Sequence, residues 1–434
     1  MIRISNNKSM KNAKTYKGTS DYQFERLFNN TKGQYANEEI TIGGETYYTN
    51  RVTVKNIERD TTYYYQRFIH GKWEPTVKYK TYGAKNFQFI FVGDPQIGGS
   101  RDRYRSYPNF LRTTSDDDGN RNDVFHWDRT VTQAMKFADT PSVLLSAGDQ
   151  ADEMGGLDCI VNQESEYSGL LYPEKLKHIV MATSVGNHEV ATNSFGRHFN
   201  VPNPLTDSAI TRSSEGWYAG YNYFFKYNNV LVVVLETNYN DESDYRITVR
   251  NAILKYPETD WRIALFHHDI FGNGKTHSQK DNDVLNRRSV IFNVLSKYGF
   301  DVVINGHDHV YTASKFVTFG NKNVTDLYSY KNYSVKDIKA NEVIENPDGT
   351  FFITANCSSG SKYLGFDTAE LDYVNYFQQK NTTSFGILDF SQDNGKAKLK
   401  ITTYEAETSN VIDGTYIFEK DVGSNVDKVH FYFI

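Results

Sequence analysis

The distribution of apolar and polar positions divides this chain into two regions. Up to about residue 84, β-branched and aromatic segments alternate with Gly and Asn turns, at positions 39–42, 47–54, 61–69 and 76–81. From residue 86 onward, apolar segments alternate with stretches whose apolar side chains recur at helical spacing, among them 127–137 and 283–297. Short strands joined by turns predict a small all-β domain, whereas alternating strands and helices predict a layered α/β sheet.

After Tyr311 the pattern changes again to loops and short apolar segments. We expect four of these segments to be strands that complete a second sheet, at 351–355, 386–390, 398–403 and 416–419. The polar stretches 101–122 and 319–348 carry many Asn, Asp, Lys, Arg and Ser residues, and we expect them to be surface insertions.

Five apolar segments of the second region end in the same way. The segments are 86–92, 141–147, 179–185, 261–266 and 302–304, and the metal-binding residue types that follow them are Asp94, Asp149, Asn187, His267, His307 and His309. In open α/β sheets ligands bind outside the carboxyl ends of the strands, so these residues are expected to converge. Gly-Asp and Gly-Asn are also common turn dipeptides, so each motif alone could be a plain turn. Their repetition favours a site for two hard or borderline divalent or trivalent ions.

Length and charge limit the alternatives. A chain of 434 residues predicts two domains, 1–84 and 85–420. Its net charge of -5 provides no basic surface field, so no obligate nucleic-acid partner is expected. The longest apolar run, 230–235, is too short to span a membrane, and no signal peptide is visible at the amino terminus. Cys159 and Cys357 can pair or remain free thiols, and the oligomeric state is left open.

The motifs identify a family by resemblance. In order they are GDPQIG (93–98), GDQAD (148–152), GNHE (186–189), FHH (266–268) and GHDH (306–309). Together they resemble the calcineurin-like metallophosphoesterases, and among these the bacterial relatives of purple acid phosphatases. The resemblance covers about residues 86–420 and implies a four-layer α/β/β/α sandwich. It also implies a fibronectin type III-like domain before the sandwich, incomplete because 84 residues are few for seven strands.

The resemblance assigns roles to the metal-binding residues. Asp149 would bridge two ions, with Asp94 and His309 on one of them and Asn187, His267 and His307 on the other. His267 is favoured over His268 because the family's pattern places the ligand first, and alternation along a strand sends the two side chains to opposite faces.

Two more histidines are implied to act on substrate. His188 would contact the phosphoryl group or the leaving oxygen, with Glu189 orienting its imidazole; the alternative is a supporting hydrogen bond. His277 would bind substrate or donate to the leaving group, unless its loop places it in solvent.

Two positions depart from the family's pattern and are further candidate ligands. Asp152 stands where purple acid phosphatases have a tyrosine, and Gln96 stands where many metallophosphoesterases have a histidine. A carboxylate in place of a phenolate favours oxygen-loving ions. We expect iron, manganese or zinc, with the identity open.

The expected function is therefore a dinuclear, metal-dependent phosphoric ester hydrolase acting on a small phosphorylated substrate. A phosphomonoesterase of the acid phosphatase type is favoured, and a phosphodiesterase, nucleotidase or pyrophosphatase is the alternative. Loops 100–125, 272–282 and 319–348 would decide between them. A metal-stabilised surface binding module is the non-enzyme alternative, although a structural metal site closes its coordination shell. The resemblance implies an extracellular or cell-surface enzyme, in conflict with the absence of a visible signal peptide.

Overall fold

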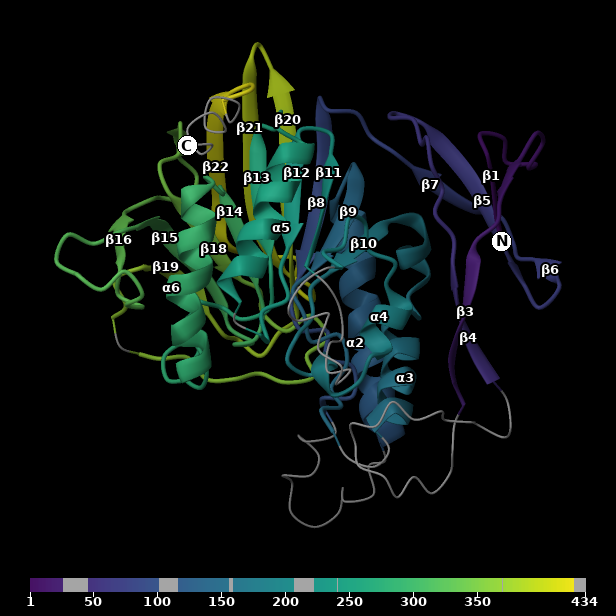
Figure 1. The fold of residues 1–434 in the computed structure, drawn as a ribbon, viewed down its shortest axis with the longest axis horizontal. Helices are drawn as coiled ribbons and strands as arrows, with labels where there is room; N and C mark the ends of the chain where they lie inside the picture. The colour runs from purple at the N-terminus through teal and green to yellow at the C-terminus, as the bar shows by residue number, and fades with distance from the viewer. Residues whose placement is uncertain are drawn as a thin grey trace.

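The structure is a computed structural model. It describes residues 1–25, 46–100, 116–155, 159–206, 222–239, 241–368 and 370–424. The strand expected at 39–42 lies outside these residues. Figure 1 shows the amino-terminal strands beside a larger α/β body that holds the rest of the described chain.

The first sheet of the body contains seven strands. Their order is β10 (Val180–Thr183), β9 (Pro141–Ser146), β8 (Asn86–Val92), β20 (Ser384–Asp393), β21 (Lys396–Glu405), β22 (Val411–Asp421) and β17 (Val343–Glu345). β8, β9 and β10 are parallel, and β20 pairs with β8 in the antiparallel direction.

The second sheet contains eight strands. Their order is β11 (Tyr223–Tyr227), β12 (Val230–Val234), β13 (Trp261–Leu265), β14 (Val302–Asn305), β18 (Thr350–Thr354), β15 (Tyr311–Phe319) and β16 (Tyr333–Lys336), with β19 (Val374–Gln378) also paired with β15. β12, β13, β14 and β18 run parallel.

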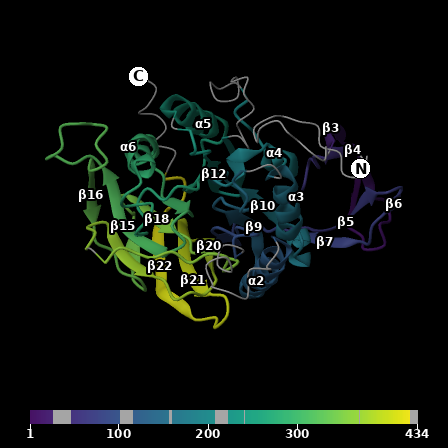
Figure 2. The ribbon, with the colours of Figure 1, turned by 90° about the horizontal axis from the view of Figure 1, so that it is seen from below.

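Helices cover the outer faces of both sheets, as Figure 2 shows for α5 and α6 on one side and α2 on the other. The described helices and helical turns are α2 (Asp116–Phe137), α3 (Cys159–Leu170), η1 (Glu174–His178), η2 (Glu189–Ala191), α4 (Ser194–His198), α5 (Glu242–Lys255) and α6 (Asn282–Lys297). No described helix is both long and apolar enough to cross a membrane.

Three apolar clusters hold these layers together. Along β8, Phe89 and Phe91 face the core between the two sheets, whereas Ile90 and Val92 face Trp127 of α2. A third cluster packs the second sheet against α5 and α6. Successive side chains of one strand therefore enter different clusters, one between the two sheets and one between a sheet and a helix. This layering confirms the predicted α/β/β/α sandwich.

One expectation from the sequence was wrong. The four segments after Tyr311 were expected to complete a second sheet. Of these four, β18 joins the second sheet, whereas β20, β21 and β22 join the first sheet beside β8. The apolar pattern of a strand indicates which of its side chains are buried, but it does not indicate which other strand pairs with it. The surface insertion expected at 101–122 also includes the first residues of helix α2, and 101–115 lie outside the described residues.

The amino-terminal region is a small all-β unit, as predicted. One sheet has the order β2 (Lys14–Tyr16), β1 (Ile2–Ser5), β5 (Thr62–Ile69) and β6 (Lys72–Trp73), with β7 (Val77–Lys80) paired with β5; β3 (Thr19–Glu25) and β4 (Thr46–Arg51) form a separate pair. Tyr65 of β5 donates a hydrogen bond to the carbonyl of Lys177 at 2.8 Å, which joins the unit to turn η1 of the body.

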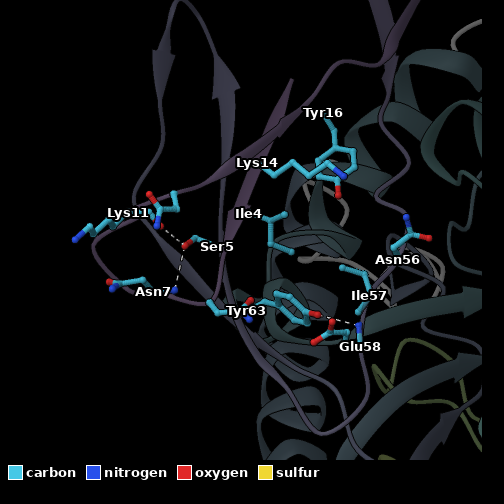
Figure 3. A pocket seen from close by; sticks show the side chains of 12 residues that line it. Ile4, Ser5, Asn7, Lys11, Lys14, Tyr16, Asn56, Ile57, Glu58 and Tyr63 are labelled. Carbon is cyan, nitrogen blue, oxygen red and sulfur yellow. Dashed lines mark hydrogen bonds between the residues drawn. The ribbon is translucent and has the colours of Figure 1, made fainter.

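A cavity of about 600 Å³ lies within this amino-terminal unit, between β1, β2 and residues 56–58. Figure 3 shows Tyr16, Lys14 and Tyr63 along it, and the hydroxyl of Tyr63 accepts a hydrogen bond from the backbone N–H of Glu58 at 2.8 Å. Its lining includes none of the candidate metal ligands, which are on the body. The cavity is therefore separate from the candidate site.

Candidate metal centre

The candidate ligands follow the carboxyl ends of strands in both sheets. The loops after the parallel strands β8, β9 and β10 carry Asp94, Asp149 and Asn187. The loops after the parallel strands β13 and β14 carry His267, His307 and His309. Because the two sheets pack face to face, these strand ends meet, and the structure brings all six side chains together.

Asp149 belongs to two groups of possible ligand atoms. One group is Asp94, Asp149 and His309, and the other is Asp149, His267 and His307; within each group the atoms lie within 4.8 Å of one another. His309 Nε2 is 3.5 Å from Asp94 Oδ1, and His267 Nε2 is 3.3 Å from Asp149 Oδ2. The carboxylate of Asp149 is thus in the position of a bridge between two cation sites.

Asn187 joins the second group. Its Oδ1 lies 2.9 Å from His267 Nε2, and His307 Nδ1 lies 3.0 Å from the same nitrogen. Three lone-pair atoms and the Asp149 carboxylate therefore converge on one point. A proton shared in a hydrogen bond can join only one pair of these atoms, whereas a divalent cation can be coordinated by all of them. Carboxylate, amide and imidazole groups are ligands for such ions.

The electrostatics of the buried carboxylates favour cations. Burial alone would lower the pKa of His267, but Asp149 and Asp94 raise it to about 9. For His309, burial is likewise outweighed by Asp94, and the pKa rises to about 10. The same negative potential attracts a metal ion, and binding of that ion would release these protons because a ligand imidazole must be neutral.

Several of these residues have a backbone conformation that side chains other than Gly rarely adopt. The φ angles are 44° at Asp94, 36° at Gln96, 47° at Asp149, 74° at His307 and 52° at His309. Each such residue costs roughly 1–3 kcal/mol unless its surroundings impose the conformation, and such residues cluster at functional sites. The sharp turns direct the side chains from the strand ends into the shared site.

Glu189 holds two of these loops. Its Oε2 accepts hydrogen bonds from the backbone N–H groups of Gly186 (2.5 Å) and Asp149 (3.1 Å), and its Oε1 accepts from Gln150 (2.7 Å) and Ala151 (3.1 Å). The expectation that Glu189 orients the imidazole of His188 is therefore wrong. The sequence places Glu189 next to His188, but the turn at η2 directs its carboxylate back to the loop of Asp149.

His188 is oriented by other groups. Its Nδ1 donates a short hydrogen bond to the backbone carbonyl of Asp152, and its Nε2 lies 2.8 Å from the amide nitrogen of Gln96. His188 Nε2 is also 3.8 Å from Asp149 Oδ2, at the edge of both ligand groups. Gln96 Oε1 is buried and has no hydrogen-bond partner, so rotation of the amide would let Gln96 accept a proton from Nε2. Gln96 can thus bond to His188 in either protonation state.

Asp152 lies beside His188 and forms an ion pair. Its Oδ1 is 3.7 Å from His188 Nδ1 and accepts a hydrogen bond from Lys362 Nζ at 2.6 Å. The carbonyl of Lys362 in turn accepts from His309 Nδ1 at 2.9 Å, which directs Nε2 of that imidazole toward Asp94. Sequence reasoning missed Lys362, because it lies in a framework segment with no metal-binding residue type beside it.

His268 and His277 both pack against His307. The ring of His268 lies 4.7 Å from that of His307, and its Nδ1 is 2.8 Å from the hydroxyl of Thr237, so that nitrogen is engaged outside the ligand groups. The ring of His277 lies 4.0 Å from that of His307 at 35°, and its Nδ1 is 3.8 Å from Asp281. His277, Asp281 and His307 form a further group of possible ligand atoms within 4.8 Å of one another, and this group shares His307 with the second group.

Residue 357 contributes a buried thiol beside the centre. The Sγ of Cys357 donates to the backbone carbonyl of Asp94 at 3.1 Å, and neither Cys357 nor Cys159 forms a disulfide. Burial opposes ionisation of the Cys357 thiol, but the hydrogen bond and charge of His309 lower its pKa to about 6.

Comparisons with known proteins bear on the family and the fold. Residues 87–311 match the family profile of the calcineurin-like phosphoesterases, and no curated protein matches the chain. Among solved structures, the chain is similar to the purple acid phosphatase PPD1 from yellow lupin (Lupinus luteus) seeds, with 13% identity, a TM-score of 0.62, and coverage of 98% of this chain and 70% of that one. A structure from Staphylococcus aureus assigned as a 5′-nucleotidase has 12% identity and a TM-score of 0.37, over 78% of this chain and 54% of that one.

Proposed function

This chain belongs to the calcineurin-like phosphoesterase family and is a phosphoester hydrolase, and we propose that it is a phosphomonoesterase of the acid phosphatase type with a dinuclear metal centre. The observation that carries the proposal is the position of Asp149, whose carboxylate is shared by two groups of ligand atoms. A shared anionic oxygen reduces the repulsion between two neighbouring cations. Asp94 and His309 would hold one ion, and Asn187, His267 and His307 the other.

The chemistry requires positions for the phosphoryl group and for the leaving oxygen. When bound, two cations supply Lewis-acid activation of a water molecule and neutralise charge on the phosphoryl oxygens. His188 is at the edge of the centre, 3.8 Å from Asp149, where its imidazole can transfer a proton to the leaving oxygen. Gln96 and the carbonyl of Asp152 hold that imidazole in place. His277, beside His307, is a second residue that can donate a proton to the leaving oxygen.

The substrate class is tested by a direct comparison. Purified protein would be assayed with a phosphomonoester, a phosphodiester, a nucleotide and pyrophosphate, with Mn²⁺, Fe²⁺, Zn²⁺ and Mg²⁺ added separately. We expect the phosphomonoester to have the highest kcat/KM with at least one metal. A diester, nucleotide or pyrophosphate hydrolysed faster with every metal would contradict the proposed substrate class without affecting the family assignment.

His188→Ala should lower turnover by roughly 10²-fold while the metal content is retained, because the change removes a proton donor and no metal ligand. The loss should be larger for an alkyl phosphate than for p-nitrophenyl phosphate, whose leaving group needs less protonation. Metal analysis and steady-state kinetics with both substrates check this. An equal loss for the two substrates would make His188 a phosphate-binding residue instead of the acid.

The iron-loaded, oxidised protein should lack an intense visible absorption band. By the family resemblance, such a band arises from a tyrosinate bound to Fe³⁺, and Asp152 stands at that position. The tyrosine nearest in sequence to the histidine pair, Tyr311, donates its hydroxyl to Asp413 at 3.0 Å and is therefore directed elsewhere. An absorption spectrum after iron loading is the measurement. A strong band that disappears in Tyr311→Phe would show that this interpretation of Asp152 is wrong.

A further inference from the structure

Two buried carboxyl groups lie beside the candidate centre and belong to neither ligand group. Asp308 lies between His307 and His309 in the sequence, and Asp269 follows shortly after His267; both side chains have no exposed surface. The two carboxyl groups face each other, since a Cβ added at Gly272 would lie 2.0 Å from Asp269 Oδ2 and 2.6 Å from Asp308 Oδ2. Burial, together with the charge of Asp308, raises the pKa of Asp269 well above its ordinary range.

The carboxylate of Asp308 binds the backbone of the loop that contains His277. One oxygen accepts a short hydrogen bond from the N–H of Gly274, and the other accepts from the N–H of Ser278 at 3.3 Å. The hydroxyl of Ser278 donates to the carbonyl of Gly274 at 3.2 Å and closes the turn. Asp308 thus holds both ends of the segment 274–278.

Glycine is required where the loop approaches these carboxyl groups. A Cβ at Gly274 would lie 2.0 Å from Asp308 Oδ1, and a Cβ at Gly272 would lie 2.0 Å from Asp269 Oδ2. No real side chain is accommodated at such distances. The backbone therefore packs directly on the carboxyl pair, and the pair determines the path of the loop.

We propose that Asp308 is a positioning residue that anchors residues 274–278 and thereby places His277 over His307. Asp308 touches neither substrate nor metal in this role. Its two neighbours in the sequence, His307 and His309, point into the centre while its own side chain points to the loop, so one short turn orients the metal ligands and the His277 loop together. The catalytic consequence of this anchoring rests on the proposed function.

Two variants test the anchor, one by changing the carboxylate and the other by changing the loop that it binds. Asp308→Asn retains one carbonyl oxygen but replaces the other acceptor by an NH₂ group, so one of the two loop N–H groups loses its acceptor. Gly274→Ala leaves the sequence between the metal ligands intact and displaces the loop sterically. Asp283→Asn is the matched control, because Asp283 is exposed and lies just beyond the loop on α6.

Amide hydrogen exchange of peptides covering residues 272–279 measures the anchoring without any assay of activity. In Asp308→Asn and Gly274→Ala we expect exchange about tenfold faster or more than in the wild type, with Asp283→Asn unchanged. Unchanged exchange in both anchor variants would overturn the proposal. If Asp308→Asn loses metal, the loss of metal could itself account for faster exchange. The exchange of Gly274→Ala then decides whether the loop is anchored, because this variant changes no residue next to a metal ligand in the sequence.

Kinetics then test the link to His277. Asp308→Asn and His277→Ala should each slow an alkyl phosphate more than p-nitrophenyl phosphate, and the double variant should be no slower than His277→Ala alone. Equal losses for both substrates, or additive losses in the double variant, would show that Asp308 does not act through His277. If the wild type hydrolyses no phosphomonoester, the proposed function fails, whereas the exchange measurement still decides whether Asp308 anchors the loop.

Discussion

Asp149→Asn should abolish hydrolysis and remove at least one metal equivalent from the purified protein. Asn has nearly the same shape, and its Oδ1 can still accept the hydrogen bond from the N–H of His188, so the local fold should persist. Asn cannot supply the negative charge that two cations would share, and the repulsion between them would then be uncompensated. Elemental analysis and a phosphatase assay on the same preparation are the measurements.

Asp94→Asn is the matched comparison for this variant, since Asp94 belongs to only one ligand group. It should weaken one metal site and leave the other occupied. A preparation of Asp149→Asn with two metal ions and more than about a tenth of wild-type activity would rule out the bridging role of Asp149.

Glu189→Ala should destabilise the protein by roughly 4 kcal/mol and lower its affinity for metal. The substitution leaves four backbone N–H groups without their acceptor, and each such group costs about 1–3 kcal/mol when buried. Two of these groups belong to Asp149 and Gly186, which lie on two of the loops that carry candidate metal ligands. Urea unfolding monitored by fluorescence, with metal analysis of the folded protein, checks both effects.

Glu174→Gln provides a control for the loss of a glutamate charge. Glu174 pairs with Lys177 on the surface, and breaking such an exposed pair should change the free energy of unfolding by less than about 1 kcal/mol. A Glu189→Ala protein as stable as this control, and loaded with two metal ions, would show that the loops do not depend on the Glu189 carboxylate.

The convergence of the candidate metal ligands could be predicted because the signal is local. An apolar strand followed by Gly and Asp, as at Asp94 and Asp149, indicates both the strand and the place where it ends. The carboxyl ends of parallel strands meet at one edge of each sheet, and the two packed sheets bring these edges together, so several local signals together predicted that these side chains converge. No knowledge of the pairing of strands was needed.

The contacts that support the ligands could not be predicted in this way. The ion pair between Asp152 and Lys362 joins positions 210 residues apart, and no pattern near either residue indicates the other. Asp308 lies inside the GHDH motif, but its function depends on a loop that precedes the motif by many residues. The role of Glu189 was misjudged because adjacency in the sequence to His188 was taken as adjacency in space.

The pairing of β8 with β20 has a consequence for synthesis of the chain on the ribosome. The loop after β8 carries Asp94, and one of the two neighbours of β8 in the sheet, β20, begins only at Ser384. While the chain emerges, one edge of an apolar strand therefore stays unpaired until almost all of the protein has been made, and such edges promote aggregation. Asp94 and the candidate ligands beside it accordingly come into register late, and we expect a ribosome-bound chain that ends before residue 384 not to bind metal at this centre.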